Sequence, residues 1–151
     1  MFVGEICTRE VATCDAATTA LELAKIMRSD YLGDLVVTEE RGGDAVPIGI
    51  VTDRDLVVRV MAMGHDPSKV TAADIMSRPL VTEYEGEELQ VTFHRLKHSH
   101  IRRIPLLDSA GALVGIVSLE DMAKHLALPV PEKSRAHLSP VAACDQEPVS
   151  N

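Results

Sequence analysis

Short runs of β-branched residues alternate along this chain with stretches in which apolar residues recur at helical spacing. This pattern predicts three strands in the first half of the chain, at residues 11–13, 35–38 and 46–51. The first predicted helix is capped by Thr18 or Thr19, and the second runs from Arg54 to a stop at Gly64. The apolar side chains expected to face the core from these helices are Leu21, Leu23, Ala24, Met27, Leu56, Val57, Val60 and Met61.

The second half of the chain has the same order of elements. Its strands are predicted at residues 80–82, 104–107 and 113–117. The last two flank a turn ending in Gly111, which is typical of a hairpin. Helices are predicted at residues 87–98 and around Met122. Residues 129–151 contain four prolines and few large apolar groups, so we expect a flexible tail there.

Two segments of the chain each occur twice. Residues 49–55, with the sequence Gly-Ile-Val-Thr-Asp-Arg-Asp, return at residues 115–121 as Gly-Ile-Val-Ser-Leu-Glu-Asp, and we call these the signature segments. The leader segments, residues 5–9 and 74–78, are also similar to each other. The leaders lie 69 residues apart and the signatures 66, because the first copy has a longer loop between its second and third strands. A length change confined to a turn is typical of a duplicated unit.

Composition narrows the classes of function. The 151 residues are 46% hydrophobic and only 3% aromatic, so the core must consist mainly of aliphatic residues and methionine. With 15 basic and 23 acidic residues, the net charge of -8 argues against a nucleic-acid backbone as partner. No apolar run approaches the length of a membrane span, no secretory signal is evident, and three cysteines without framework spacing favour a reducing cytoplasm. A P-loop, a nucleophile elbow and a His-Glu-x-x-His motif are all missing, so we do not expect an enzyme.

The doubled signature, the doubled leader and the segment Ile101-Arg102-Arg103-Ile104-Pro105 together resemble the CBS domain, the regulatory module named after cystathionine β-synthase. The resemblance covers repeats at residues 3–64 and 70–128, and the chain looks similar to short stand-alone bacterial CBS pairs such as the hypoxic response protein. It implies an α/β fold of two βαββα repeats with pseudo-twofold symmetry, in which the sheets are packed between helices, commonly as a homodimer. It also implies that an adenosine-containing ligand (AMP, ADP, ATP or S-adenosylmethionine) binds between the repeats and modulates a partner protein.

The resemblance assigns site residues to two clefts, in which the last Asp of a signature binds ribose and nearby hydroxyl and basic groups meet phosphate. The cleft that we call the Asp121 cleft would contain Thr8, Val11, Ala12, Leu32, Arg102, Arg103, Ser118 and Asp121. The Asp55 cleft would contain Ser77, Leu80, Val81, Ile101, Gly33, Asp34, Thr52, Arg54 and Asp55. The pair Arg102-Arg103 offers donors to phosphate oxygens, whereas Asp34 would repel them. We therefore expect a phosphorylated ligand in the Asp121 cleft, and the Asp55 cleft to be empty or to take an uncharged adenosine moiety.

Simpler interpretations of the same residues stay open. Thr52-x-x-Asp55 and Ser118-x-x-Asp121 both match a helix capping box, which accounts for the hydroxyls and carboxylates without a ligand. The two signature glycines can likewise serve strand packing only.

Histidine and cysteine residues suggest a different function. His94 and His98 are four residues apart on one predicted helix, and a site made by Cys14 and His125 is a candidate zinc site. The alternative hypothesis is thus a metal- or redox-responsive interaction module whose nucleotide clefts are not used.

Overall fold

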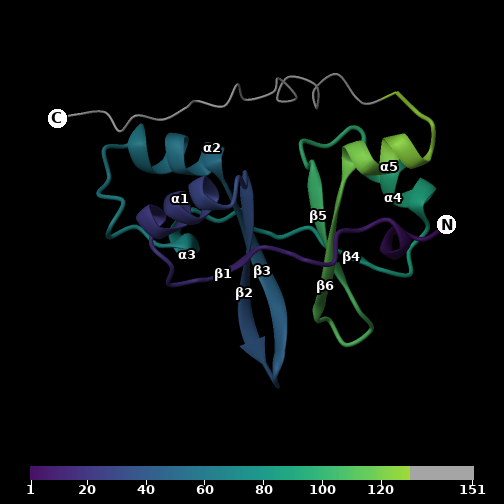
Figure 1. The fold of residues 1–151 in the computed structure, drawn as a ribbon, viewed down its shortest axis with the longest axis horizontal. Helices are drawn as coiled ribbons and strands as arrows, with labels where there is room; N and C mark the ends of the chain where they lie inside the picture. Colours follow the sequence, from purple (N-terminus) through teal and green to yellow (C-terminus); the bar gives the residue numbers. More distant parts are fainter. Residues whose placement is uncertain (130–151) are drawn as a thin grey trace.

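The computed structural model describes residues 1–129, which form two halves of the same design (Figure 1). The first half contains the elements β1 (Thr13–Asp15), α1 (Ala20–Ser29), β2 (Asp34–Arg41), β3 (Asp44–Thr52) and α2 (Asp53–Asp55), the last continuing as a π-helix, η2 (Leu56–Met61). The second half contains β4 (Glu83–Tyr84), α4 (Leu89–Leu96), β5 (Arg103–Leu107), β6 (Leu113–Ser118) and α5 (Leu119–His125). Two short helices, η1 (Val3–Glu5) and α3 (Ala72–Ile75), belong to the segments that lead into each half. The expected tail lies outside the described residues, apart from Pro129.

Each half has a three-stranded sheet with the same topology. In the first sheet, β2 pairs in parallel with β1 and antiparallel with β3, and in the second sheet β5 pairs in the same way with β4 and β6. Figure 1 shows the two sheets next to each other at the centre of the molecule, with α1 to α3 outside the first and α4 and α5 outside the second. The predicted α/β fold of two repeats, with sheets packed between helices, is therefore confirmed. Among residues 1–129, no helix has the length and apolar character needed to cross a membrane.

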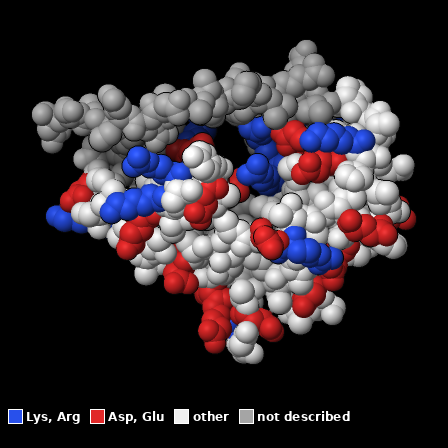
Figure 2. All heavy atoms as spheres, viewed as in Figure 1, with Lys and Arg blue, Asp and Glu red and all other residues white. Residues whose placement is uncertain are grey.

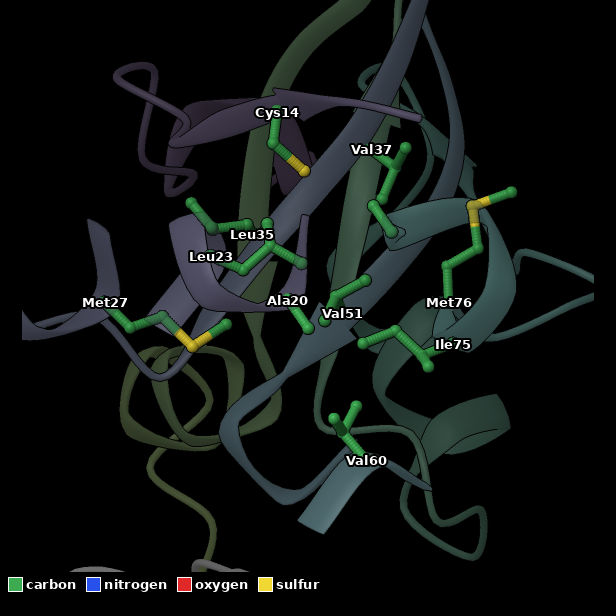
Figure 3. Packing of buried hydrophobic residues seen from close by; sticks show 11 residues of the cluster. Cys14, Ala20, Leu23, Met27, Leu35, Val37, Val51, Val60, Ile75 and Met76 are labelled. Carbon is green, nitrogen blue, oxygen red and sulfur yellow. The ribbon is translucent and has the colours of Figure 1, made fainter. Parts of the chain in front are cut away.

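Two aliphatic cores stabilise the two halves of the molecule. Each core includes residues from the leader region of the other repeat, by which we mean the leader segment together with the short helix at its start, η1 or α3. In the first core, side chains of α1, β2 and β3 such as Leu23 and Val37 pack with Ile75 and Met76 (Figure 3). In the second core, Val3 is fully buried with residues of α4, β5 and β6. Each leader region therefore crosses over and completes the opposite core.

The short strands lie later in the chain than predicted. The expected strands at residues 11–13 and 80–82 are replaced by β1 and β4, which begin at Thr13 and Glu83. The residues before them belong to no strand, and the main chain there connects each leader, which packs on the opposite repeat, with the sheet of its own repeat. Apolar composition alone did not distinguish such a connecting segment from a strand.

The helices also differ in detail from the prediction. Thr19 caps α1 as expected, but the helix buries Ala20, Leu23 and Met27, while Leu21 and Ala24 are exposed. In η2 the bonding changes to the wider π pattern, with the N–H of Ala62 donating to the carbonyl of Val57. A wider turn changes which residues face inward, so Val60 is buried whereas the expected core residues Val57 and Met61 are exposed. Helix α4 ends at Leu96, so His94 and His98 do not share one helix as predicted.

Candidate functional site

The two signature segments form equivalent corners, at which a strand passes directly into a helix. In the first corner, the carboxylate of Asp55 accepts hydrogen bonds from the backbone N–H and the hydroxyl of Thr52, each at 2.8 Å. In the second, the hydroxyl of Ser118 donates to the carboxylate of Asp121 at 2.6 Å and accepts from its backbone N–H at 3.1 Å. Both hydroxyl residues therefore cap their helices, but the reciprocal capping box is complete only at the first corner, because at the second the carboxylate of Asp121 is bound by the hydroxyl of Ser118 and not by its backbone N–H. Both carboxylates can still accept further hydrogen bonds, because an ionised carboxylate has about four acceptor positions.

Each corner lies close to the leader of the other repeat. The backbone N–H of Thr8 donates to the carbonyl of Ile116 at 2.9 Å, and the N–H of Ile116 donates back to Thr8 at 3.0 Å. Ile116 precedes Ser118 by two residues, so the first leader lies beside the second corner. In the equivalent contact, the N–H of Ser77 donates to the carbonyl of Ile50 at 2.9 Å. Leader and signature are therefore brought together in the combination predicted for each cleft.

The signature glycines are explained by this crossing. A Cβ atom added at Gly49 would lie 2.4 Å from the sulfur of Met76, and one at Gly115 would lie 2.6 Å from the sulfur of Cys7. Both distances are too short for any real contact, so only glycine lets the opposite leader approach the strand. The interpretation of these glycines as packing residues is supported without reference to a ligand.

The two arginines expected to meet phosphate already have carboxylate partners. Arg102 Nη2 lies 2.9 Å from Glu120 Oε1, within the second repeat. Arg103 forms an ion pair with Asp34 of the first repeat, so this pair joins the two halves. Figure 2 shows a hollow between the halves where basic and acidic side chains meet. Both arginines and Asp34 were expected near the clefts, but neither ion pair was predicted from the sequence.

The other predicted site residues occupy the segments between elements. Val11 and Ala12 are half-buried just before β1, and the carbonyl of Ala12 accepts a hydrogen bond from Val36 in β2. Leu32 and Ile101 are half-buried just before β2 and β5. In the segment that precedes β4, Leu80 is half-buried and Val81 is 40% exposed. Arg54 is exposed at the start of α2, and its side chain makes no ion pair within residues 1–129.

The residues proposed for zinc lie in different environments. Cys14 is buried in the first core, pointing inward between α1 and the sheet (Figure 3), and this burial raises the pKa of its thiol to about 11. A raised pKa disfavours the thiolate that binds metal. His125 is exposed at the end of α5 in the second repeat, with Nδ1 2.9 Å from the carbonyl oxygen of Asp121. Among the described residues, no group of three or more His, Cys, Asp or Glu side chains is arranged to hold a metal ion.

Comparison with known proteins identifies the family. The model of the CBS domain matches this chain twice, at residues 3–62 and 72–128. The chain belongs to the CBS-domain family. Hypoxic response protein 1 of Mycobacterium tuberculosis is 32% identical to this CBS pair over 126 residues, which are 83% of this chain and 81% of the relative. An uncharacterized protein of Methanopyrus kandleri is 40% identical over 120 residues, 80% of this chain, but the match spans only 60% of that protein.

Solved structures of other CBS proteins have the same fold and contain two kinds of ligand. A CBS domain pair in complex with 5′-methylthioadenosine and S-adenosyl-L-methionine is 25% identical, with a TM-score of 0.70, over 84% of this chain and 96% of that one. Hypoxic response protein I with two coordinated zinc ions is 26% identical, also with a TM-score of 0.70, over 83% of this chain and 98% of that one. The resemblance predicted from the doubled motifs is confirmed. The ligands belong to those proteins and serve as candidates for this one.

Proposed function

We propose that this CBS pair is a regulatory sensor that binds an adenosine-containing ligand in the Asp121 cleft. The observation that carries the proposal is the double hydrogen bond between Thr8 and Ile116, which places the first leader beside Ser118 and Asp121. A nucleoside needs both sides of such a cleft, because backbone groups can bind the base while a carboxylate accepts hydrogen bonds from the ribose diol. The related CBS pair with 5′-methylthioadenosine and S-adenosyl-L-methionine supports this class of ligand.

The Asp121 cleft is favoured over the Asp55 cleft because its carboxylate is less engaged. Asp55 accepts two hydrogen bonds from Thr52 and has Arg59 Nε 3.4 Å from its other oxygen. Asp121 accepts one hydrogen bond from a side chain, and its other oxygen lies 3.6 Å from the mostly exposed ammonium group of Lys124. Asp121 therefore retains more capacity to accept hydrogen bonds from a ribose.

Regulation would follow from the position of the ligand between the two repeats. A ligand held by the first leader and the second corner favours one packing of the halves, to the extent that it binds that packing more tightly. The change in packing would be transmitted to a partner protein, and no catalytic step is needed.

We also propose a homodimer, in which a second copy would cover the exposed apolar side chains of Val57, Val58 and Met61 along η2.

Calorimetric titration of chelator-treated protein with 5′-methylthioadenosine, S-adenosylmethionine, AMP, ADP and ATP tests the sensor. We expect saturable binding of at least one compound, weakened roughly tenfold or more by Asp121→Ala, since a hydrogen bond to a charged group is lost. Asp55→Ala is the matched control, because it removes the equivalent capping carboxylate from the other corner. Binding should survive in this control.

Two outcomes would contradict the proposal. Equal loss in Asp121→Ala and Asp55→Ala would assign the effect to helix capping rather than to the Asp121 cleft. Absence of binding by any of the five compounds, together with stabilisation by zinc alone in a thermal unfolding assay, would favour the metal-responsive alternative.

A further inference from the structure

The ion pair between Asp34 and Arg103 lies at a special position in the duplicated fold. The two residues are equivalent in the repeats, since each begins the second strand of its sheet and pairs with the hydroxyl residue of its signature. Asp34 is opposite Thr52 in the register of β2 and β3, and Arg103 is opposite Ser118 in that of β5 and β6. Equivalent positions of a pseudo-twofold pair meet only where both lie close to the axis, and these two residues do so. Here they carry opposite charges and bind each other.

A second pair of equivalent positions has the reverse arrangement. The sixth residue of the signature segment is Arg54 in the first repeat and Glu120 in the second. Glu120 is only 13% exposed and binds Arg102, the residue next to Arg103. Carboxylates therefore already occupy both guanidinium groups that would otherwise offer donors to phosphate oxygens.

We propose that Asp34 determines the ligand specificity of the Asp121 cleft, because it binds the guanidinium group of Arg103 in place of a phosphate. The selected ligands would be adenosines whose 5′ substituent is neutral or cationic, such as a thioether or a sulfonium group, and phosphorylated adenosines would be disfavoured. This inference rests on the proposed function and names the ligand class of the same site. It revises the expectation from sequence that Arg102-Arg103 favours a phosphorylated ligand.

The physical reason lies in competition for one guanidinium group. A carboxylate and a phosphate bind arginine through the same forked geometry, so a phosphate must displace Asp34 before Arg103 can bind it. The displaced carboxylate, of which only 22% is exposed, would then lie near the phosphate and repel it. A thioether leaves the ion pair intact, and a sulfonium group adds a charge of the sign that Asp34 attracts.

The test compares wild type with Asp34→Asn by calorimetric titration of 5′-methylthioadenosine, AMP, ATP and inorganic tripolyphosphate. We expect wild type to bind 5′-methylthioadenosine at least tenfold more tightly than AMP. Asp34→Asn should tighten the binding of AMP and ATP roughly tenfold, because Arg103 gains a free fork for phosphate, and leave 5′-methylthioadenosine within about twofold. The double variant Asp34→Asn, Arg103→Gln should lose this gain.

A matched control separates the ion pair from net charge. Asp44→Asn removes one negative charge at the far end of the β2–β3 hairpin, at a residue that makes no ion pair within the described chain. Affinity for AMP should not change in this variant. An equal gain for AMP in Asp44→Asn and Asp34→Asn, or a preference of wild type for ATP, would overturn the inference.

Tripolyphosphate distinguishes failure of this inference from failure of the proposed function. If no adenosine compound binds any variant, the adenosine sensor is refuted. Tighter binding of tripolyphosphate to Asp34→Asn than to wild type and to the double variant would still support Asp34 as the group that excludes phosphate. Equal binding of tripolyphosphate to all three would refute that role.

Discussion

At the scale of single residues, Gly49 and Gly115 hold positions that a side chain would disrupt. The added Cβ would lie 2.9 Å from the Cβ of Met76 at the first position and 3.2 Å from the carbonyl oxygen of Thr8 at the second. Gly49→Ala and Gly115→Ala should therefore each lower the free energy of unfolding by about 1–3 kcal/mol, because the opposite leader must shift. Chemical denaturation measures both changes. Gly86→Ala is the control, since nothing lies within 4 Å of its added Cβ.

A second substitution separates a local clash from a general effect on the strand. Cys7→Ala removes the sulfur that lies 2.6 Å from the Cβ added at Gly115. It should thus restore part of the stability that Gly115→Ala loses, and restore nothing in Gly49→Ala. Losses no larger than that of Gly86→Ala would mean that the leaders do not pack against the strands as described.

At the scale of elements, two helices carry a carboxylate in their first turn that accepts hydrogen bonds from the threonine before the helix. Hydrogen bonds from the backbone and the hydroxyl of Thr19 lower the pKa of Glu22, and those of Thr71 lower the pKa of Asp74. A group whose pKa is lower in the folded state stabilises the fold above its ordinary pKa, and this contribution is lost as the pH falls through the folded value. Stability should therefore decline as the pH falls below the ordinary pKa values of these groups, 4.5 for Glu22 and 3.8 for Asp74. Glu22→Gln and Asp74→Asn should each make this decline shallower.

Denaturation at a series of pH values measures this effect. Glu40→Gln, on the exposed end of β2, is the control for removing one carboxylate, and it should leave the acid slope as in wild type. If all three variants change the slope equally, the capping hydrogen bonds of α1 and α3 contribute nothing specific to acid sensitivity.

The elements also show which parts of this fold the sequence could predict. Capping motifs and hydrophobic spacing depend on local chemistry, so Thr18 or Thr19, Thr52 and Ser118 were identified as caps of helices, and the structure selects Thr19 for the first. The positions of β1 and β4 depend on pairing with β2 and β5, which come later in the chain. The π pattern of η2 likewise has no counterpart in the spacing of its apolar residues. Local periodicity holds no information about such contacts, and these predictions were wrong or shifted.

At the scale of the whole molecule, duplication made much of the candidate site predictable. The duplicated motifs carry a resemblance to the CBS domain, and that resemblance assigned each leader to the signature of the opposite repeat, beside which the structure places Thr8 and Ser77. They did not predict that Asp34 and Arg103 bind each other, because that requires knowing which equivalent positions meet at the axis. The unequal charges at these positions were visible in the sequence, and equivalence within a symmetric pair is the signal that would have connected them.

The exchange of leaders predicts that the two repeats behave as one cooperative unit. Val3 is fully buried in the second core, Ile75 and Met76 are buried in the first, and Arg9 binds Glu85 and the carbonyl of Val114 in the second repeat. A protease site inserted between the exposed residues Gly64 and His65 should therefore cut the chain without separating its halves. The cut protein should elute as one species in gel filtration and unfold in one calorimetric transition.

A charge placed in the exchanged segment should break this association. Val3→Asp buries a carboxylate among the apolar side chains of the second core, at a cost on the order of 3 kcal/mol or more. The halves of this variant should separate after cleavage. Met1→Asp is the control, because Met1 is 67% exposed and the same charge remains in water. Separation of the cut wild-type halves would show that the exchanged leaders do not hold the repeats together. Persistence of the association in Val3→Asp would show that the first leader is dispensable, and that the second leader, the ion pair at the axis and the packing of β3 against β6 are sufficient.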